Sequence, residues 1–167
     1  MDRRSALGVS RILLTIGLLL LPRATSAAGD APLDRATLRG LKGIGVVIDA
    51  IDPELRKLGV TREALITRLL GRLQGDGITI DPAATEFVGL RITAVRGSRG
   101  PWALSLSFGL YQPVLLSRSH DVRTSTQTWE VETVLMADVK VLSMACSETA
   151  DDLADRFASA FHSVNPQ

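Results

Sequence analysis

The sequence predicts an α+β fold, with one mainly antiparallel sheet of four to five strands and two main helices packed on one of its faces. Three observations predict it. A β-branched apolar run comes early, long stretches of alternating apolar and polar residues occupy the middle, and a helical apolar stripe stands on either side of those stretches. The expected order of elements is β-α-β-β-β-β-α.

The first strand is predicted over residues 44–51, where apolar residues occupy both faces, as in a buried central strand. A helix start follows at once. Asp52 suits an N-cap and Pro53 the first helical position, and Gly59 ends this helix after one or two turns.

The first main helix is predicted to begin at Thr61 and to end at residues 75–77. Its apolar residues recur every three or four positions and form one stripe, while the arginines lie off it: Leu65, Ile66, Leu69, Leu70 and Leu73. A short strand over residues 78–80 should follow.

Residues 88–94 and 102–111 are predicted to form a hairpin with one buried face. In both strands large apolar residues alternate with small or polar ones, so the second face of the sheet should be open to water and available for docking. Pro113 lacks a backbone N–H, and we expect the second strand to be an edge there or to bulge.

A polar loop is predicted over residues 117–125, followed by a strand over residues 129–135. Residues 137–143 suit a strand and a helix equally. From about Ser143 a second main helix is indicated by apolar residues four, three, four, three and four positions apart: Cys146, Ala150, Leu153, Phe157, Ala160 and Val164.

Residues 1–28 have the parts of an export signal. Arginines precede the apolar run Ile12–Leu21, and small residues follow it, so cleavage is expected after Ala27 or Ala28. The run rises about 15 Å as a helix, roughly half of a bilayer core, which argues against a retained membrane anchor. We expect a protein of the periplasm or the extracellular space, with residues 29–40 as a flexible tether and residues 41–167 as one domain.

Of 19 basic and 18 acidic residues, four arginines and one aspartate lie in this leader, which leaves 15 basic and 17 acidic residues. This balance removes the electrostatic basis for binding nucleic acid, and no stable membrane anchor is expected. Cys146 is the only cysteine, so it cannot form an internal disulfide. We interpret it as a buried apolar residue.

No catalytic, cofactor-binding or metal-ligating set is predicted. Asp52 is better explained as an N-cap than as a partner of Asp49 in acid–base catalysis. The glycines at 40, 43 and 45 precede a strand, whereas a phosphate-binding loop follows one. His120 lies between a serine and an aspartate, but adjacent residues cannot form a hydrolytic triad, and no zinc-ligand spacing surrounds it.

Four residues are candidates for an interaction surface: Trp129, Arg91, Tyr111 and His120. Trp129 is one of two tryptophans, and a place in the core and an exposed binding role both suit it. The other three are polar or amphipathic side chains on the predicted open face or in the predicted loop.

Several short motifs resemble a family of small exported bacterial proteins without an assigned function: Gly40-Leu41, Gly59 to Leu65, Gly75 to Ile78, Thr128-Trp129, Leu153 to Phe157 and Asn165-Pro166. The order of elements is similar to that of the N-terminal domain of the Tol translocation propeller protein and of the lipopolysaccharide-assembly lipoprotein. The resemblance implies a part for envelope binding or assembly, without catalytic residues. Unlike the lipoprotein, this chain has no cysteine in its leader.

We therefore expect an exported, non-catalytic binding or assembly module that acts through the face or edge of its sheet. An envelope protein or a lipid-containing component is the expected partner, and no cofactor is expected. Two alternatives stay open. A small hydrolase or metal-dependent enzyme would hold His120 in a pocket beside Asp121 or Glu130. A carrier of an apolar ligand would have a cavity against Trp102 and Phe108.

Overall fold

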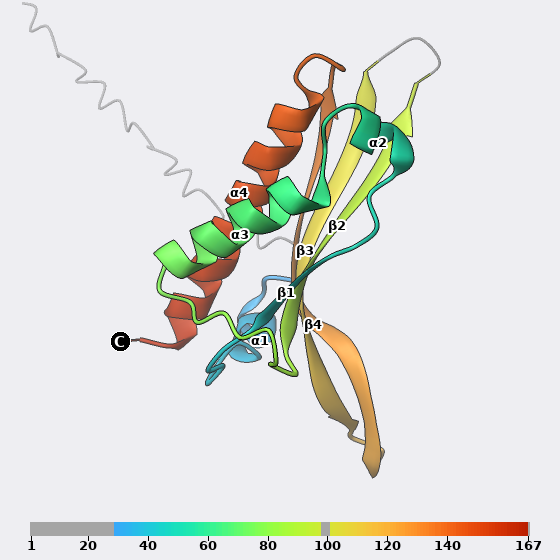
Figure 1. Cartoon of the computed structure of the whole chain (residues 1–167). Helices are drawn as coiled ribbons and strands as arrows, with labels where there is room; N and C mark the ends of the chain where they lie inside the picture. Colours follow the sequence, from blue (N-terminus) through green and yellow to red (C-terminus); the bar gives the residue numbers. More distant parts are fainter. Residues whose placement is uncertain (1–28, 98–100, 167) are drawn as a thin grey trace, which may run out of the picture.

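A computed structural model describes residues 29–97 and 101–166 as a four-stranded sheet with helices on one face (Figure 1). The leader predicted over residues 1–28 lies outside the described residues. The elements, in order, are α1 (Pro32–Ala36), β1 (Gly45–Ile48), α2 (Pro53–Lys57), α3 (Arg62–Gly75), β2 (Phe87–Arg96), β3 (Trp102–Leu116), β4 (Ser119–Ala137) and α4 (Leu142–Val164).

The sheet has the order β1-β2-β3-β4. The predicted α+β class with one sheet and two main helices is confirmed, but the sheet is mixed, because β1 runs parallel to β2. The β2–β3 and β3–β4 pairs are antiparallel, as expected. A parallel neighbour needs a crossover, and residues 49–86, which contain α2 and α3, provide it.

The local signals at the helix starts act as the sequence predicts. Asp52 caps α2 by accepting a hydrogen bond from the backbone N–H of Glu54 at 2.7 Å. Thr61 caps α3 by accepting one from Ala64 at 3.3 Å. Gly59 separates the two helices with a φ of +87°, a conformation that glycine adopts without a Cβ clash.

The core lies between the sheet and the pair α3 and α4. The predicted stripes of both helices face it, and so do the predicted apolar positions of β2 and β3. Phe157 of α4 lies at its centre, in edge-to-face contact with Phe108 and Trp129 at centroid separations of 5.9 and 5.2 Å. On the outside of the helix pair, Arg72 forms an ion pair with Asp155 at 2.5 Å.

Two local predictions are wrong, and one open assignment is resolved. Residues 78–80 form an isolated bridge to Ile44 and no strand. The segment 117–125, expected as a polar loop, is mostly strand, because its serines and threonines pair across a hairpin whose turn is at residues 117–118. The ambiguous segment 137–143 is neither all strand nor all helix, since β4 ends at Ala137 and α4 begins at Leu142.

The segment 29–40, which the sequence suggests is a flexible tether, contains α1 and is attached to the sheet. Leu38 has no exposed surface. The carbonyl oxygen of Gly29 accepts a hydrogen bond from the backbone N–H of Glu130 at 3.1 Å. This segment has too few apolar residues to show a helical period, so the pattern of the sequence alone does not predict its packing.

Candidate interaction surfaces of the sheet

None of the helices in residues 29–97 and 101–166 lies on the second face of the sheet (Figure 1). We call it the uncovered face. Its residues alternate along the strands with the buried ones, and pairing places them in rows across β2, β3 and β4. The rows run from an aromatic end to an apolar end, and their members include Phe87, Gly89, Arg91, Val95, Ser105, Ser107, Tyr111, Glu132, Val134 and Met136.

The middle of the uncovered face is polar and its side chains are paired. Arg91 Nε donates to Asp49 Oδ2 at 2.9 Å, and Ser105 Oγ donates to the carboxylate of Glu132. The hydrogen bond to Asp49 is the main cause of a raised pKa of Arg91, to which the nearby Tyr111 also contributes. Both members of the Arg91–Asp49 pair are about half exposed, so the ion pair contributes little to stability. Its main effect is to hold the guanidinium group of Arg91 in one orientation.

At one end of this face an aromatic pair lies across β2 and β3. The rings of Phe87 and Tyr111 are stacked, with centroids 5.1 Å apart and planes 9° from parallel. A Cβ at Gly89 would stand 3.1 Å from Cε2 of Tyr111, so the glycine lets the ring lie close to the sheet. Tyr111 is half-buried and held in place, as an anchor residue in an interface often is.

Beyond Tyr111, β3 and β4 continue as a two-stranded hairpin, which we call the projecting hairpin (residues 112–127). It extends away from the body of the protein (Figure 1). Among the strands described, β2 ends opposite Tyr111, so both outer edges of this hairpin lack a neighbouring strand. Pro113 is at such an edge, two residues after a register shift, which confirms the expectation for it.

The projecting hairpin is exposed along most of its length. Leu115 and Val122 are exposed apolar residues, and Arg118 and Arg123 are exposed cations. His120 is also exposed and stands next to the turn, while Ser119 Oγ donates to Asp121 Oδ1 at 2.5 Å. The hydrolase alternative needed His120 in a pocket with an acid, and this position removes its geometric basis.

Trp129 is a core residue and is not part of the uncovered face, which corrects its place among the candidate interaction residues. Its side chain is 1% exposed. Its Nε1 donates to Asp30 Oδ1 at 2.8 Å, a partner within the supposed tether. Trp129 alternates with Glu130 in the strand, and the parity that places Val131 in the core places Trp129 there too.

The other candidates from the sequence have structural roles. Asp52 is an N-cap, and Gly45 is the first residue of β1, so the glycines precede a strand and do not open a helix. Cys146 is fully buried, and burial raises the pKa of its thiol to about 11. Ring Nε2 of His162 lies 2.8 Å from the carbonyl oxygen of Asp76. Among the described residues no group of three or more histidines, cysteines and carboxylates could hold a metal ion.

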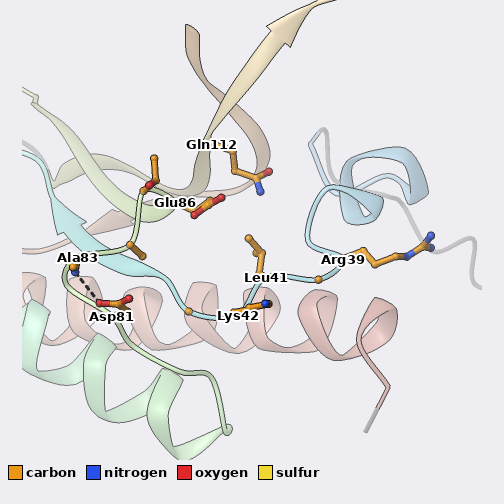
Figure 2. Close-up of a pocket in the computed structure, with 11 residues that line it drawn as sticks. Arg39, Leu41, Lys42, Asp81, Ala83, Glu86 and Gln112 are labelled. Carbon is orange, nitrogen blue, oxygen red and sulfur yellow. Dashed lines mark hydrogen bonds between the residues drawn. The ribbon is translucent and has the colours of Figure 1, made fainter. Parts of the chain in front are cut away.

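A polar cavity of about 480 Å³ lies at the root of the projecting hairpin (Figure 2). Glu86 and Gln112 lie on one side of it and Leu41 on the other, whereas Arg39 points away. Thr128 Oγ1 donates to Gln112 Oε1 at 2.7 Å, which fixes the amide. The sequence does not indicate this cavity, because its lining residues come from three separate segments of the chain, residues 39–43, residues 81–86 and Gln112.

The carrier alternative needs a cavity against Trp102 and Phe108. Both side chains are buried within the core, at 5% and 0% exposure. Four pockets in the described part of the chain, of about 260 to 480 Å³, border neither residue. In the described residues, no helix combines the length and the apolar character needed to cross a membrane.

Neither a family model nor a curated protein matches this chain. Solved structures similar to it include three bacterial proteins. A PelC variant, a dodecamer from Paraburkholderia phytofirmans, is 14% identical with a TM-score of 0.38, and the match covers 72% of this chain and 86% of that one. The rare lipoprotein B of Shewanella oneidensis is 14% identical with a TM-score of 0.36, over 72% of this chain and 96% of that one.

A minor lipoprotein of Acinetobacter baumannii is 11% identical with a TM-score of 0.31, over 75% of this chain and 97% of that one. Two of these three neighbours are thus described as lipoproteins. Sequence identities and TM-scores as low as these indicate nothing about the activity or the partner of this protein.

Proposed function

We propose that this protein is an exported, non-catalytic binding or assembly module of the cell envelope, which docks on another envelope protein through the projecting hairpin and the adjoining end of the uncovered face. The projecting hairpin is the observation that carries the proposal. The leader-like residues 1–28 support export, because they have the charge, length and small residues of a cleavable signal.

The energetics of the projecting hairpin favour a partner. An isolated two-stranded ribbon is at best marginally stable in water, since it has no third strand and no packed face. Here the pairing continues from Gln112↔Thr126 to Leu115↔Arg123, and no other described strand pairs with either outer edge. Free strand edges accept a further strand, and the exposed Leu115 and Val122 would be covered by one.

The root of the hairpin supplies a rigid end to the same surface. Tyr111 is stacked on Phe87, so its conformational entropy is already reduced before any partner binds. Arg91, two rows away on the same face, provides an oriented charge. A projecting arm next to a fixed aromatic and charged patch suits recognition of another protein better than it suits catalysis on a small molecule.

Capture of crosslinked partners from envelope preparations tests this function. The purified protein is added to detergent-solubilised envelope and crosslinked, and the double variant Leu115→Ser with Val122→Ser is treated in the same way. The matched control is Leu33→Ser, because Leu33 is 81% exposed on α1, outside the proposed surface. We expect one set of adducts with the native protein and the control, and its loss with the hairpin variant. Equal capture by all three would contradict docking through the hairpin.

A further inference from the structure

The outer edge of β4 is covered only in its middle. The backbone N–H of Glu130 donates to Gly29, and Arg156 Nη1 donates to the carbonyl oxygen of Glu132 at 3.3 Å. Backbone groups of alternate residues in a strand point the same way. The N–H and C=O of Val134 and Met136 therefore also point outward, since pairing with β3 is regular from Trp129 to Ala137.

These four outward groups have no partner in the described part of the chain. The side chains beside them are apolar and exposed, at 71% for Val134 and 70% for Met136. An added strand would satisfy the backbone groups and cover both side chains at once. A lipid surface would cover the side chains but leave the backbone groups unpaired, which is costly.

We propose that the strand added here is the same stretch of a second copy of this chain, residues 133–137, paired antiparallel about a two-fold axis at Leu135. This proposal does not depend on the proposed function, because the projecting hairpin has no part in it. A two-fold contact closes on itself, so it gives a dimer and not a fibre.

The free stretch fits this symmetry in one register. With Leu135 opposite its own copy, Val134 stands opposite Met136 and the reverse, and each residue exchanges both backbone hydrogen bonds with its partner. Centring the pair on Val134 would put Met136 opposite Glu132, whose carbonyl oxygen Arg156 already occupies. Centring it on Met136 would put Val134 opposite Asp138, which is beyond the end of β4.

The charged side chains next to this stretch also meet in this arrangement. In an antiparallel pair, the residues after Ala137 of one copy run past the residues before Thr133 of the other. Lys140 then stands opposite Glu130, an attractive pair that the two-fold axis repeats. Asp138 stands opposite Glu132, and Arg156, whose Nη1 donates to the carbonyl oxygen of Glu132, lies beside this pair and offsets part of the repulsion between the two carboxylates.

Further exposed apolar residues follow directly after β4. They are Val139, Val141 and Met144. They adjoin the paired stretch and add to the area that a second copy would cover. Two strands of five residues bury less than the roughly 1,600 Å² of a standard stable interface, so the dimer should be reversible and depend on concentration.

Sedimentation of the purified protein over a range of concentrations tests the proposal, after expression of the full sequence. We expect a reversible monomer–dimer equilibrium. Val134→Lys should weaken the dimer at least about tenfold, because the two lysines, each opposite Met136 of the other copy, stand diagonally across the new strand pair and repel each other. The matched control is Val95→Lys, which adds the same charge on the same face but in β2, where Val95 is 65% exposed.

A monomer at every concentration would overturn the proposal, and so would equal weakening by the two lysine variants, which would indicate face-to-face contact. Cysteine pairing tests the register. Residues in such hydrogen-bonded pairs have Cα atoms about 5.5 Å apart, a separation that suits a disulfide. A mixture of Val134→Cys and Met136→Cys should oxidise to crosslinked heterodimers, and each variant alone should not. Efficient crosslinking of either variant alone would overturn the register.

Discussion

Trp129 Nε1 donates a hydrogen bond to Asp30 Oδ1 at 2.8 Å, and this contact joins β4 to a segment 99 residues earlier in the chain. Arg35 holds the same carboxylate from α1, with its Nε and Nη2 at 2.8 and 2.6 Å from the two oxygens. The neighbouring Gly29 covers part of the outer edge of β4, because its carbonyl oxygen accepts from the N–H of Glu130, and the Asp30 contact holds this segment in place.

The two tryptophans should respond differently to replacement by phenylalanine. Trp129→Phe removes the hydrogen bond to Asp30 and should lower the free energy of unfolding by about 1–3 kcal/mol more than Trp102→Phe. Trp102 Nε1 is buried without a hydrogen-bond partner in the described part of the chain, so its removal relieves an unpaired donor. Chemical denaturation of both variants measures the difference. An equal loss would show that the Asp30 contact contributes nothing.

The pKa of Asp30 gives a pH-dependent prediction. Burial of the carboxyl raises its pKa, but the hydrogen bonds from Arg35 and Trp129 outweigh this, and the net pKa lies below the ordinary 3.8. A depressed pKa stabilises the fold above the ordinary value, and this stabilisation is lost as the pH falls through the folded-state pKa. Asp30→Asn should therefore be less stable than the native protein at about pH 7 and should approach it below about pH 3.8. A difference that is constant with pH would contradict this.

Cys146 should be chemically inert in the folded protein. Its thiol is fully buried, and burial raises its pKa to about 11, so almost no thiolate exists at neutral pH. A thiol-specific reagent at about pH 8 should not label the native protein and should label one thiol per chain after denaturation. Rapid labelling of the native protein would show that α4 opens or is misplaced.

Asn165 should stabilise the junction between α1 and α4. Its Oδ1 accepts from the N–H of Gly40 at 2.7 Å, and its Nδ2 donates to the carbonyl oxygens of Leu38 and Phe161 at 3.0 and 2.9 Å. Asn165→Ala should lower the free energy of unfolding by about 1–3 kcal/mol, because partly buried groups lose their partners. The control is Ser163→Ala, which removes a bond within α4 alone. Equal effects would contradict a role in joining the segments.

The sequence predicts well where one physical signal decides the outcome. The caps at Asp52 and Thr61 and the stripe of α3 depend on local spacing, and all three occur as expected. The alternation of large apolar residues with small or polar ones along β3 is enough to predict which of its faces is buried. The parallel pairing of β1 with β2 was not predictable in the same way, because it depends on a crossover between distant segments.

The candidate site was predictable only in part. The open face with Arg91 and Tyr111 follows from alternation, and the structure has it. The projecting hairpin is not predictable in this way, because the polar residues 117–125 are typical of a loop, although serine and threonine also pair well across strands. The parity of β4 favours the core for Trp129, but its hydrogen bond to Asp30 has no signal in the sequence, because the two residues are far apart in the chain.

Site-specific photocrosslinking in cells tests the central claim most directly. A photoreactive residue replaces Leu115 at the exposed hairpin, and for comparison it replaces the exposed Glu63 on α3, on the helical side of the fold. Docking through the projecting hairpin predicts a defined adduct of the exported protein with one envelope component from position 115 and none from position 63. No adduct at position 115, or the same adduct from both positions, would contradict it.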